Sequence, residues 1–304
     1  MFGADIRTAV DVIAPRLVRI ETIGGHEKVG EEFANEGICT GILLESDGYV
    51  MTSAFNFLHD PASILLRFAD GTKKIAKKIA TDKNRMLTLL KAEDMSTPQE
   101  MTLPIFRSKS SIRTGERCIA VGVALSLLEP NIALGIVSGK DRIWGKAIQT
   151  DAAVGPNNYG GPLIDTDGKM LGLLVPLSMM SNELTGGAEF YDAGVGLAIP
   201  MDDIIALLPK LKEGKDLEPG SLGIGFKDNQ TFIGDAVIAS IEPKSPAEKA
   251  EIKPGDKITA IDGKPINSAL DIVKNLRLRY AGETLTIQLE RQGKEQTITL
   301  TAVR

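Results

Sequence analysis

The stretch that decides how this chain is interpreted is Val154–Leu163, which reads VGPNNYGGPL. Its Gly-Gly-Pro run is typical of a tight, backbone-exposed loop that usually holds a catalytic serine. Here Tyr159 stands in the place of that serine. Two alternatives follow: a nucleophile loop that has lost its chemistry, or a loop of another kind with the same outline.

Around this loop, the chain from residue 16 to residue 200 is a series of short apolar runs separated by turn residues. The Asp-Gly pairs at 47–48, 70–71 and 167–168 are typical of hairpin turns. Strands at such short spacing predict an all-β barrel or sandwich. A helix that ends at Pro15 is expected before the strands, and residues 201–214 predict a closing helix with one apolar face.

The C-terminal part predicts a separate α+β unit. Residues 213–220 are charged, contain Pro219 and Gly220, and form the expected linker between a domain at 1–212 and a domain at 221–304. In the second domain, apolar residues recur at helical spacing from Ala269 to Tyr280, and two strands follow. A unit of roughly 85 residues is large enough to fold alone.

Composition excludes several classes of function. The chain has 304 residues, a formal net charge of −5 and a pI of about 5.3, which argue against a general nucleic-acid binder. No apolar run approaches the roughly 20 residues of a membrane span. The N-terminus has no secretory hydrophobic region, so cytoplasmic residence and a leader removed earlier both stay open.

Cysteine and histidine spacing predicts neither a metal site nor a cofactor. Cys39 and Cys118 form no Cys-x-x-Cys pair, and the two histidines, His26 and His59, lie far apart. We expect both cysteines to be buried as small apolar residues, and a disulfide between them stays an alternative.

Several segments, in order, carry a resemblance to a known family. These segments are residues 9–20, 40–57, 80–93, 149–173, 194–200, 221–226 and 245–266. Together they resemble the HtrA/Deg family of serine proteases, and the resemblance covers nearly the whole chain. It implies a mostly β fold, with a chymotrypsin-like double β-barrel followed by an α+β PDZ domain.

The chain departs from the family at the positions that carry the chemistry. Phe55 stands where the family has histidine, Met86 where it has aspartate, and Tyr159 where it has serine. Asn157 replaces the glycine that leaves room for the oxyanion amide. Serine proteolysis needs a nucleophile, a base and a group that orients the base, and these side chains supply no such relay.

These departures predict a pseudoenzyme of the serine endopeptidase class with no catalytic residues. Phe55 and Met86 would fill the vacated volume without unpaired charge, and we expect them to pack near Tyr159 as a plug. The alternative is an active HtrA/Deg-class endopeptidase with a displaced site, for which His59 with Asp60 is a candidate pair.

The PDZ resemblance implies that the second domain binds the C-termini of proteins or peptides. The backbone amides of Leu222, Gly223 and Ile224 would hold the terminal carboxylate. The expected pocket for the last side chain is formed by Ile224, Phe226, Ile272 and Leu276. The chain would then act as an adaptor, a chaperone-like binder or a regulator of an active relative.

The remaining expectations come from the family alone. Its members commonly assemble as trimers through the barrel domain, so the resemblance implies a homo-oligomer. It also implies an extracytoplasmic location, in the periplasm or cell envelope. No nucleic-acid partner and no transmembrane segment are expected.

Overall fold

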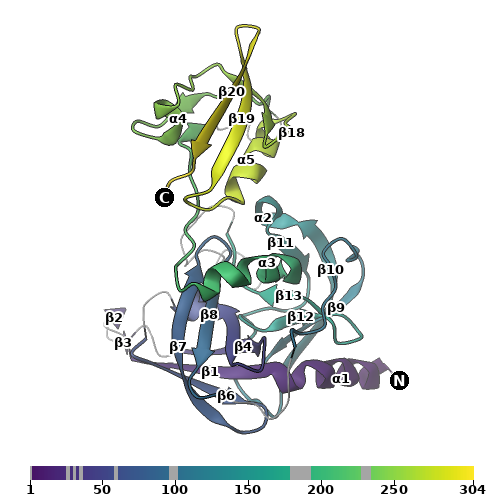
Figure 1. Cartoon of the computed structure of the whole chain (residues 1–304). Coiled ribbons are helices and arrows are strands. Elements are labelled where there is room, and N and C mark those ends of the chain that lie inside the picture. The colour runs from purple at the N-terminus through teal and green to yellow at the C-terminus, as the bar shows by residue number, and fades with distance from the viewer. Residues whose placement is uncertain are drawn as a thin grey trace. The chain divides into compact units, whose positions relative to one another are not determined.

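The computed structural model describes residues 2–24, 28–29, 32–33, 37–57, 61–95, 102–178, 193–226 and 234–304. Contacts divide the chain into two compact units, Met1–Asp216 and Leu217–Arg304. The division falls inside the segment 213–220 that the sequence predicts as a linker. The colour ramp of Figure 1 separates the two units by residue number.

The first unit begins with a closed barrel of six antiparallel strands, in the order β1-β4-β5-β8-β7-β6. Burial alternates along β6 in the pattern expected of a strand with one face toward the core. The lysine-rich start of β7 is mostly exposed or half-buried, and its last three residues are buried. The strands are β1 (Leu17–Ile23), β4 (Gly37–Leu43), β5 (Tyr49–Ser53), β6 (Ser63–Phe68), β7 (Lys73–Asp82) and β8 (Leu87–Ala92).

A second closed barrel follows, in the order β10-β11-β14-β13-β12-β9. Its inner strands β13 and β14 are buried along their whole length, which explains their continuous apolar sequence. The strands are β9 (Arg117–Gly122), β10 (Asn131–Asp141), β11 (Ala147–Thr150), β12 (Pro162–Ile164), β13 (Met170–Leu174) and β14 (Gly196–Pro200). A short separate pair consists of β2 (Lys28–Val29) and β3 (Glu32–Phe33).

Helices begin and end the first unit. In α1 (Phe2–Ile13) the buried residues include Val10 and Ile13, and η1 (Ala14–Arg16) ends it at the predicted proline. Helix α3 (Met201–Lys212) buries the predicted apolar face. Two short turns are η2 (Ala54–Phe57) and α2 (Arg142–Gly145). Within the described part of the chain, none of the helices has the length and apolar character that a membrane crossing requires.

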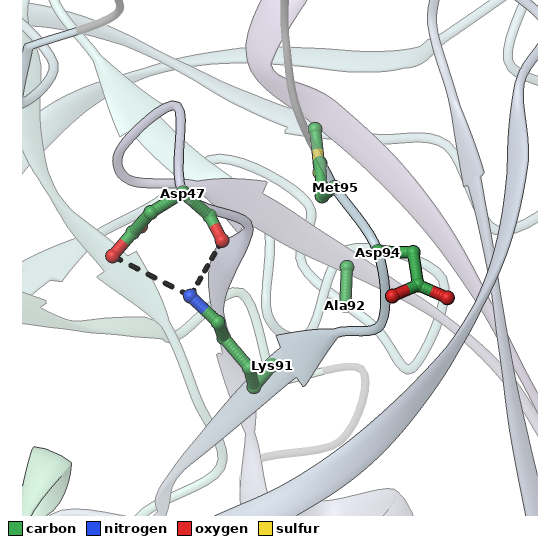
Figure 2. A pocket seen from close by; sticks show the side chains of 5 residues that line it. All are labelled: Asp47, Lys91, Ala92, Asp94 and Met95. Carbon is green, nitrogen blue, oxygen red and sulfur yellow. Dashed lines mark hydrogen bonds and ion pairs between the residues drawn. The ribbon is translucent and has the colours of Figure 1, made fainter.

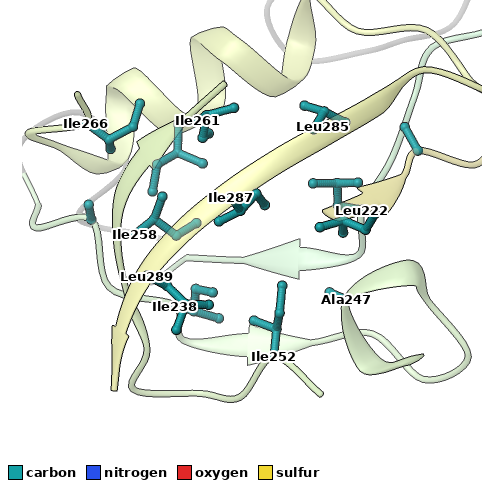
Figure 3. Packing of buried hydrophobic residues seen from close by; sticks show 14 residues of the cluster. Leu222, Ile238, Ala247, Ile252, Ile258, Ile261, Ile266, Leu285, Ile287 and Leu289 are labelled. Carbon is teal, nitrogen blue, oxygen red and sulfur yellow. The ribbon is translucent and has the colours of Figure 1, made fainter. Parts of the chain in front are cut away.

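The second unit is a small α+β domain. A four-stranded sheet in the order β18-β17-β19-β20 packs with α5 around the apolar cluster that Figure 3 shows. Ser268 and Asp271 form a capping box that fixes the start of α5. The elements are β15 (Ile224–Gly225), β16 (Ser240–Ile241), α4 (Pro246–Lys249), β17 (Lys257–Ile261), β18 (Lys264–Pro265), α5 (Ala269–Arg277), β19 (Thr284–Arg291) and β20 (Lys294–Thr301).

The predicted architecture, two β-barrels followed by an α+β domain, is confirmed. Both cysteines are buried and free, so the disulfide alternative is excluded. Burial raises the pKa of the Cys39 thiol to about 11, which keeps it in the unreactive thiol form at neutral pH.

Candidate functional site

The loop at Val154–Leu163 lies where the two barrels meet. It connects β11 to β12 of the second barrel, yet Gly160 touches the first barrel. A Cβ atom on Gly160 would lie 2.0 Å from the Thr40 carbonyl oxygen and 2.3 Å from the Thr52 hydroxyl. With a φ of 82°, Gly160 also has a backbone conformation that favours glycine. Close approach and backbone geometry therefore both require glycine here.

The next glycine is equally constrained, from the other side. A Cβ atom on Gly161 would lie 2.1 Å from the carbonyl oxygen of Val121 in β9. The backbone is held to β13 by hydrogen bonds of 2.8 Å from the Gly160 amide to Leu174 and from the Leu174 amide to Gly161. The pair Gly160–Gly161 therefore lies in tight contact with β9, β13 and the first barrel. We call this pair the Gly-Gly wedge.

Buried threonines of the first barrel clamp the loop. The Thr40 hydroxyl donates to the Asn157 carbonyl oxygen over 3.2 Å and accepts from the Val123 amide over 2.8 Å. The Thr52 hydroxyl donates to the Thr40 carbonyl oxygen over 2.7 Å. Since both threonines are fully buried, these bonds satisfy polar groups that burial would otherwise penalise.

Two of the three residues that the resemblance aligns with catalytic positions, Phe55 and Tyr159, are in direct contact. The rings of Phe55 and Tyr159 lie 5.5 Å apart at 68°, an edge-to-face arrangement. The expectation that Phe55 packs near Tyr159 is thus confirmed, and Tyr159 is 7% exposed, so little of its ring is open to a substrate.

Met86 is connected to the segment that carries Phe55 through its backbone, and the packing of its side chain against Phe55 and Tyr159 stays a prediction. Its carbonyl oxygen accepts a 2.8 Å hydrogen bond from the amide of Ala54, the residue before Phe55. The side chain is buried, and φ is 59°, a left-handed conformation that is rare for a long side chain and better tolerated by Asp or Asn. Met86 therefore adopts this backbone conformation at an energetic cost.

The backbone around Asn157 is folded into successive tight turns. The amide of Asn158 donates to the Gly155 carbonyl over 2.8 Å, and the amide of Tyr159 donates to the Pro156 carbonyl over 3.3 Å. An oxyanion hole needs amides that point at the substrate oxygen. In this conformation the Tyr159 amide donates to a carbonyl of its own loop instead.

Groups that could rebuild a relay are sparse among the described residues at this site. The Ser53 hydroxyl is 1% exposed and accepts a 3.2 Å hydrogen bond from the Phe55 amide. The candidate pair His59 and Asp60 lies outside the described residues, as does His26. In the described ranges, no cluster of three or more His, Cys, Asp or Glu side chains could hold a metal ion.

In the second unit, three consecutive carbonyls of one loop are bonded to the domain body. The Ser221 carbonyl accepts from Val303 over 2.9 Å, that of Leu222 from Ala247 over 3.0 Å, and that of Gly223 from Glu242 over 2.9 Å. In a trans peptide the N–H of the next residue points away from such a carbonyl. The amides of residues 222, 223 and 224 therefore face away from the body of the domain.

The loop and the adjoining strand have the form that holds an anion. Gly223 has φ of 71°, and a Cβ there would lie 2.2 Å from that of Ser245. A left-handed residue between neighbours of ordinary conformation makes successive amides converge, as in anion-binding nests. Ile224 faces Ile241 in a pair flanked by the Glu242–Gly223 bond, so the amide and carbonyl of Ile224 face the other edge of β15.

The side chains predicted to line the pocket divide into two groups. Ile224, Phe226 and Leu276 are half-buried at the margin of the apolar cluster, where a ligand side chain could reach them. Ile272 is fully buried and Leu222 is 2% exposed, so both belong to the core (Figure 3 labels Leu222). The prediction that Ile272 lines the pocket is untested, and its complete burial places it in the core of the domain.

A shallow hollow on the first barrel was not anticipated from the sequence. It holds about 500 Å³ and is lined by Asp47, Lys91, Ala92, Asp94 and Met95. Figure 2 shows the Lys91 ammonium group turned to Asp47, whose carbonyl and carboxylate oxygens lie 2.5 and 3.5 Å from it. The charge of Lys91 is thus compensated within the hollow, which has no sequence signature.

Comparisons with known proteins agree with this architecture. Residues 39–173 match the family model of the trypsin-like peptidase domain, and residues 220–302 match the model of the PDZ domain. The chain is 30% identical to a probable periplasmic serine endoprotease DegP-like of Bartonella henselae over 85% of its length. It is 29% identical to the periplasmic serine endoprotease DegP of Escherichia coli over 86% of its length.

The chain spans about half the length of these curated relatives, 52% and 56% respectively. Among solved structures, it superimposes on the HtrA-type protease AlgW with tripeptide at a TM-score of 0.76. That similarity covers 98% of this chain and 96% of the other at 22% identity, and at this identity it shows the fold alone.

The comparisons contradict the prediction that the chain is not an enzyme. The curated relatives are named serine endoproteases, and no finding shows that this chain has lost activity. The prediction rested on Phe55, Met86 and Tyr159, and these positions bear on one route only, the Ser–His–Asp relay. They say nothing of groups elsewhere on the chain.

The packing around the Gly-Gly wedge predicts a large difference between two glycines of the same loop. Gly160→Ala is expected to lower the free energy of unfolding by at least about 2 kcal/mol, because its Cβ meets backbone and its φ disfavours alanine. This loss is expected to lower the midpoint temperature of thermal unfolding by roughly 4–8 °C.

The matched control is Gly155→Ala, because a Cβ at Gly155 meets nothing within 4 Å. This variant is expected to stay within about 0.5 kcal/mol of the wild type. Equal unfolding temperatures for the two variants would contradict the role assigned to the wedge.

Proposed function

Starting from an HtrA/DegP-like chain with a trypsin-like peptidase domain followed by a PDZ domain, we propose that it binds the C-termini of proteins and peptides. The terminal carboxylate would meet the amides of Leu222, Gly223 and Ile224. The last side chain would pack against Ile224, Phe226 and Leu276.

One observation carries this proposal: the carbonyls of residues 221–223 are all bonded to the domain body, which turns the next three amides outward. Backbone amides that converge on one point suit a carboxylate, since charge-assisted hydrogen bonds are roughly twice as strong as neutral ones. The outward edge of β15 could then pair with the peptide backbone, as in strand addition. The related AlgW structure, with its tripeptide, supports peptide binding by this class of protein.

In this proposal, the aromatic residues at the junction of the two barrels serve packing. The edge-to-face contact of Phe55 and Tyr159, and the turn that holds the Tyr159 amide, support that role. The chain would then present bound C-termini to other proteins as an adaptor, a chaperone-like binder or a regulator of an active relative.

Location and assembly complete the proposal. The relatives are named periplasmic, which supports an extracytoplasmic location for this chain. We also propose that the barrels form a homo-oligomer, a trimer, with a second copy covering the connection between β9 and β10. There Leu125 and Leu128 are 71% and 91% exposed, and large apolar side chains at such exposure favour contact with another protein.

A second candidate function is that of a serine-type endopeptidase with a displaced site. The names of the relatives favour it. In that case the nucleophile lies elsewhere than residue 159, because a buried phenol in an aromatic contact is poorly placed to attack a peptide bond.

Binding through the terminal carboxylate predicts strong discrimination between two forms of one peptide. From a library of fluorescein-labelled peptides with free C-termini, the tightest ligand is remade as its C-terminal carboxamide. Fluorescence anisotropy is expected to show saturable binding of the acid and at least tenfold weaker binding of the carboxamide. Failure of every free-acid peptide to saturate would overturn the proposed function.

The displaced-site candidate predicts how turnover responds to a change at the junction. Tyr159→Phe keeps the ring and its contact with Phe55 but removes the hydroxyl. Whatever rate the purified chain shows on casein, this variant is expected to show the same rate. A loss of turnover in Tyr159→Phe, with labelling by a fluorophosphonate probe lost in parallel, would instead identify Tyr159 as the nucleophile.

The proposed oligomer predicts a solution mass near three times the 32.5 kDa of the chain. Leu128→Asp is expected to shift that mass toward the monomer, because the charge would be buried at the interface. Light scattering after size exclusion measures both. A monomeric wild type would refute the assembly without touching peptide binding.

A further inference from the structure

Ser221 opens the loop that faces the ligand in the proposed function, and its backbone is fixed. Its amide donates to the Val303 carbonyl over 2.6 Å, and its carbonyl accepts from the Val303 amide over 2.9 Å. The residue is exposed. Its side chain is thus presented at the surface of the loop from an anchored position.

The hydroxyl of Ser221 is bonded to one of the three outward amides. The Gly223 amide donates to the Ser221 Oγ atom over 3.2 Å. Gly223 is the left-handed residue at the centre of the nest, between Leu222 and Ile224. In the free protein, a neutral oxygen from the chain itself therefore occupies the position that a ligand oxygen would take.

We propose that the Ser221 hydroxyl is an internal competitor of the ligand carboxylate and thereby sets the affinity of the groove. This inference rests on the proposed function. A C-terminal carboxylate can accept a hydrogen bond from the Gly223 amide only after the bond from that amide to the Ser221 hydroxyl has broken. The gain is the difference between a charge-assisted hydrogen bond and the neutral one that it replaces.

The hydrogen bond between the Gly223 amide and the Ser221 hydroxyl is weak enough for a ligand to displace. It is also strong enough to lower the affinity of that ligand measurably. At 3.2 Å it lies at the long end of the N–H···O range, and the residue is exposed to water. Removing the competitor should therefore raise the affinity about threefold, or roughly 0.7 kcal/mol at 1.4 kcal/mol per factor of ten. The structural change is confined to a side chain, since the backbone bonds to Val303 stay.

The test measures the dissociation constant of the tightest free-acid peptide for the full chain and three variants. Ser221→Ala removes the hydroxyl and is expected to bind about threefold tighter. Ser221→Thr keeps the hydroxyl on an extended backbone that suits a β-branched residue, and is expected to bind like the wild type. Thr299→Ala removes an exposed hydroxyl on β20, away from the loop, and serves as the control.

Tighter peptide binding by Ser221→Ala would distinguish a competing hydroxyl from a structural one. If the hydroxyl only held the loop in shape, its removal would weaken binding. Weaker or unchanged binding by Ser221→Ala, with circular dichroism showing a folded chain, would overturn the competitor and leave the proposed function standing. No saturable binding by the wild type or by Ser221→Ala would instead overturn the proposed function, and the competitor with it.

Discussion

The first unit depends on the contact of two glycines with backbone on both sides. Gly160 and Gly161 pass between Thr40 of one barrel and Val121 of the other at distances that admit no side chain. Because interiors are close-packed, such a contact fixes the relative position of everything attached to it. The loop at residues 154–163 is therefore needed for the fold of the double barrel, whatever chemistry residue 159 carries.

Because the glycines fix the loop at residues 154–163, its conformation does not depend on which side chains stand at residues 55, 86 and 159. Phe55 and Tyr159 pack against each other as an aromatic pair. The carbonyl oxygen of Met86 accepts a hydrogen bond from the amide of Ala54. The same loop holds the Tyr159 amide in a turn with Pro156. The comparisons nevertheless place the chain beside proteins named serine endoproteases.

Much of the fold could be predicted from the sequence, because apolar alternation and Asp-Gly turns report directly on strands. The family positions also predicted the meeting of Phe55 and Tyr159. The left-handed backbone of Met86, the turn between Pro156 and Tyr159 and the bond from Gly223 to Ser221 could not be predicted. Each depends on backbone angles set by tertiary contacts, and the complete burial of Ile272 likewise depends on tertiary packing.

The Gly-Gly loop therefore has a structural role, and we propose that the amides of residues 222–224 recognise the ligand. The most direct test is the ¹⁵N–¹H spectrum of the full chain during titration with the tightest free-acid peptide. We expect the amide signals of Leu222, Gly223 and Ile224 to shift most and those of Gly160 and Gly161 not to move. Shifts confined to the barrel loop, with residues 222–224 unchanged, would contradict the proposal.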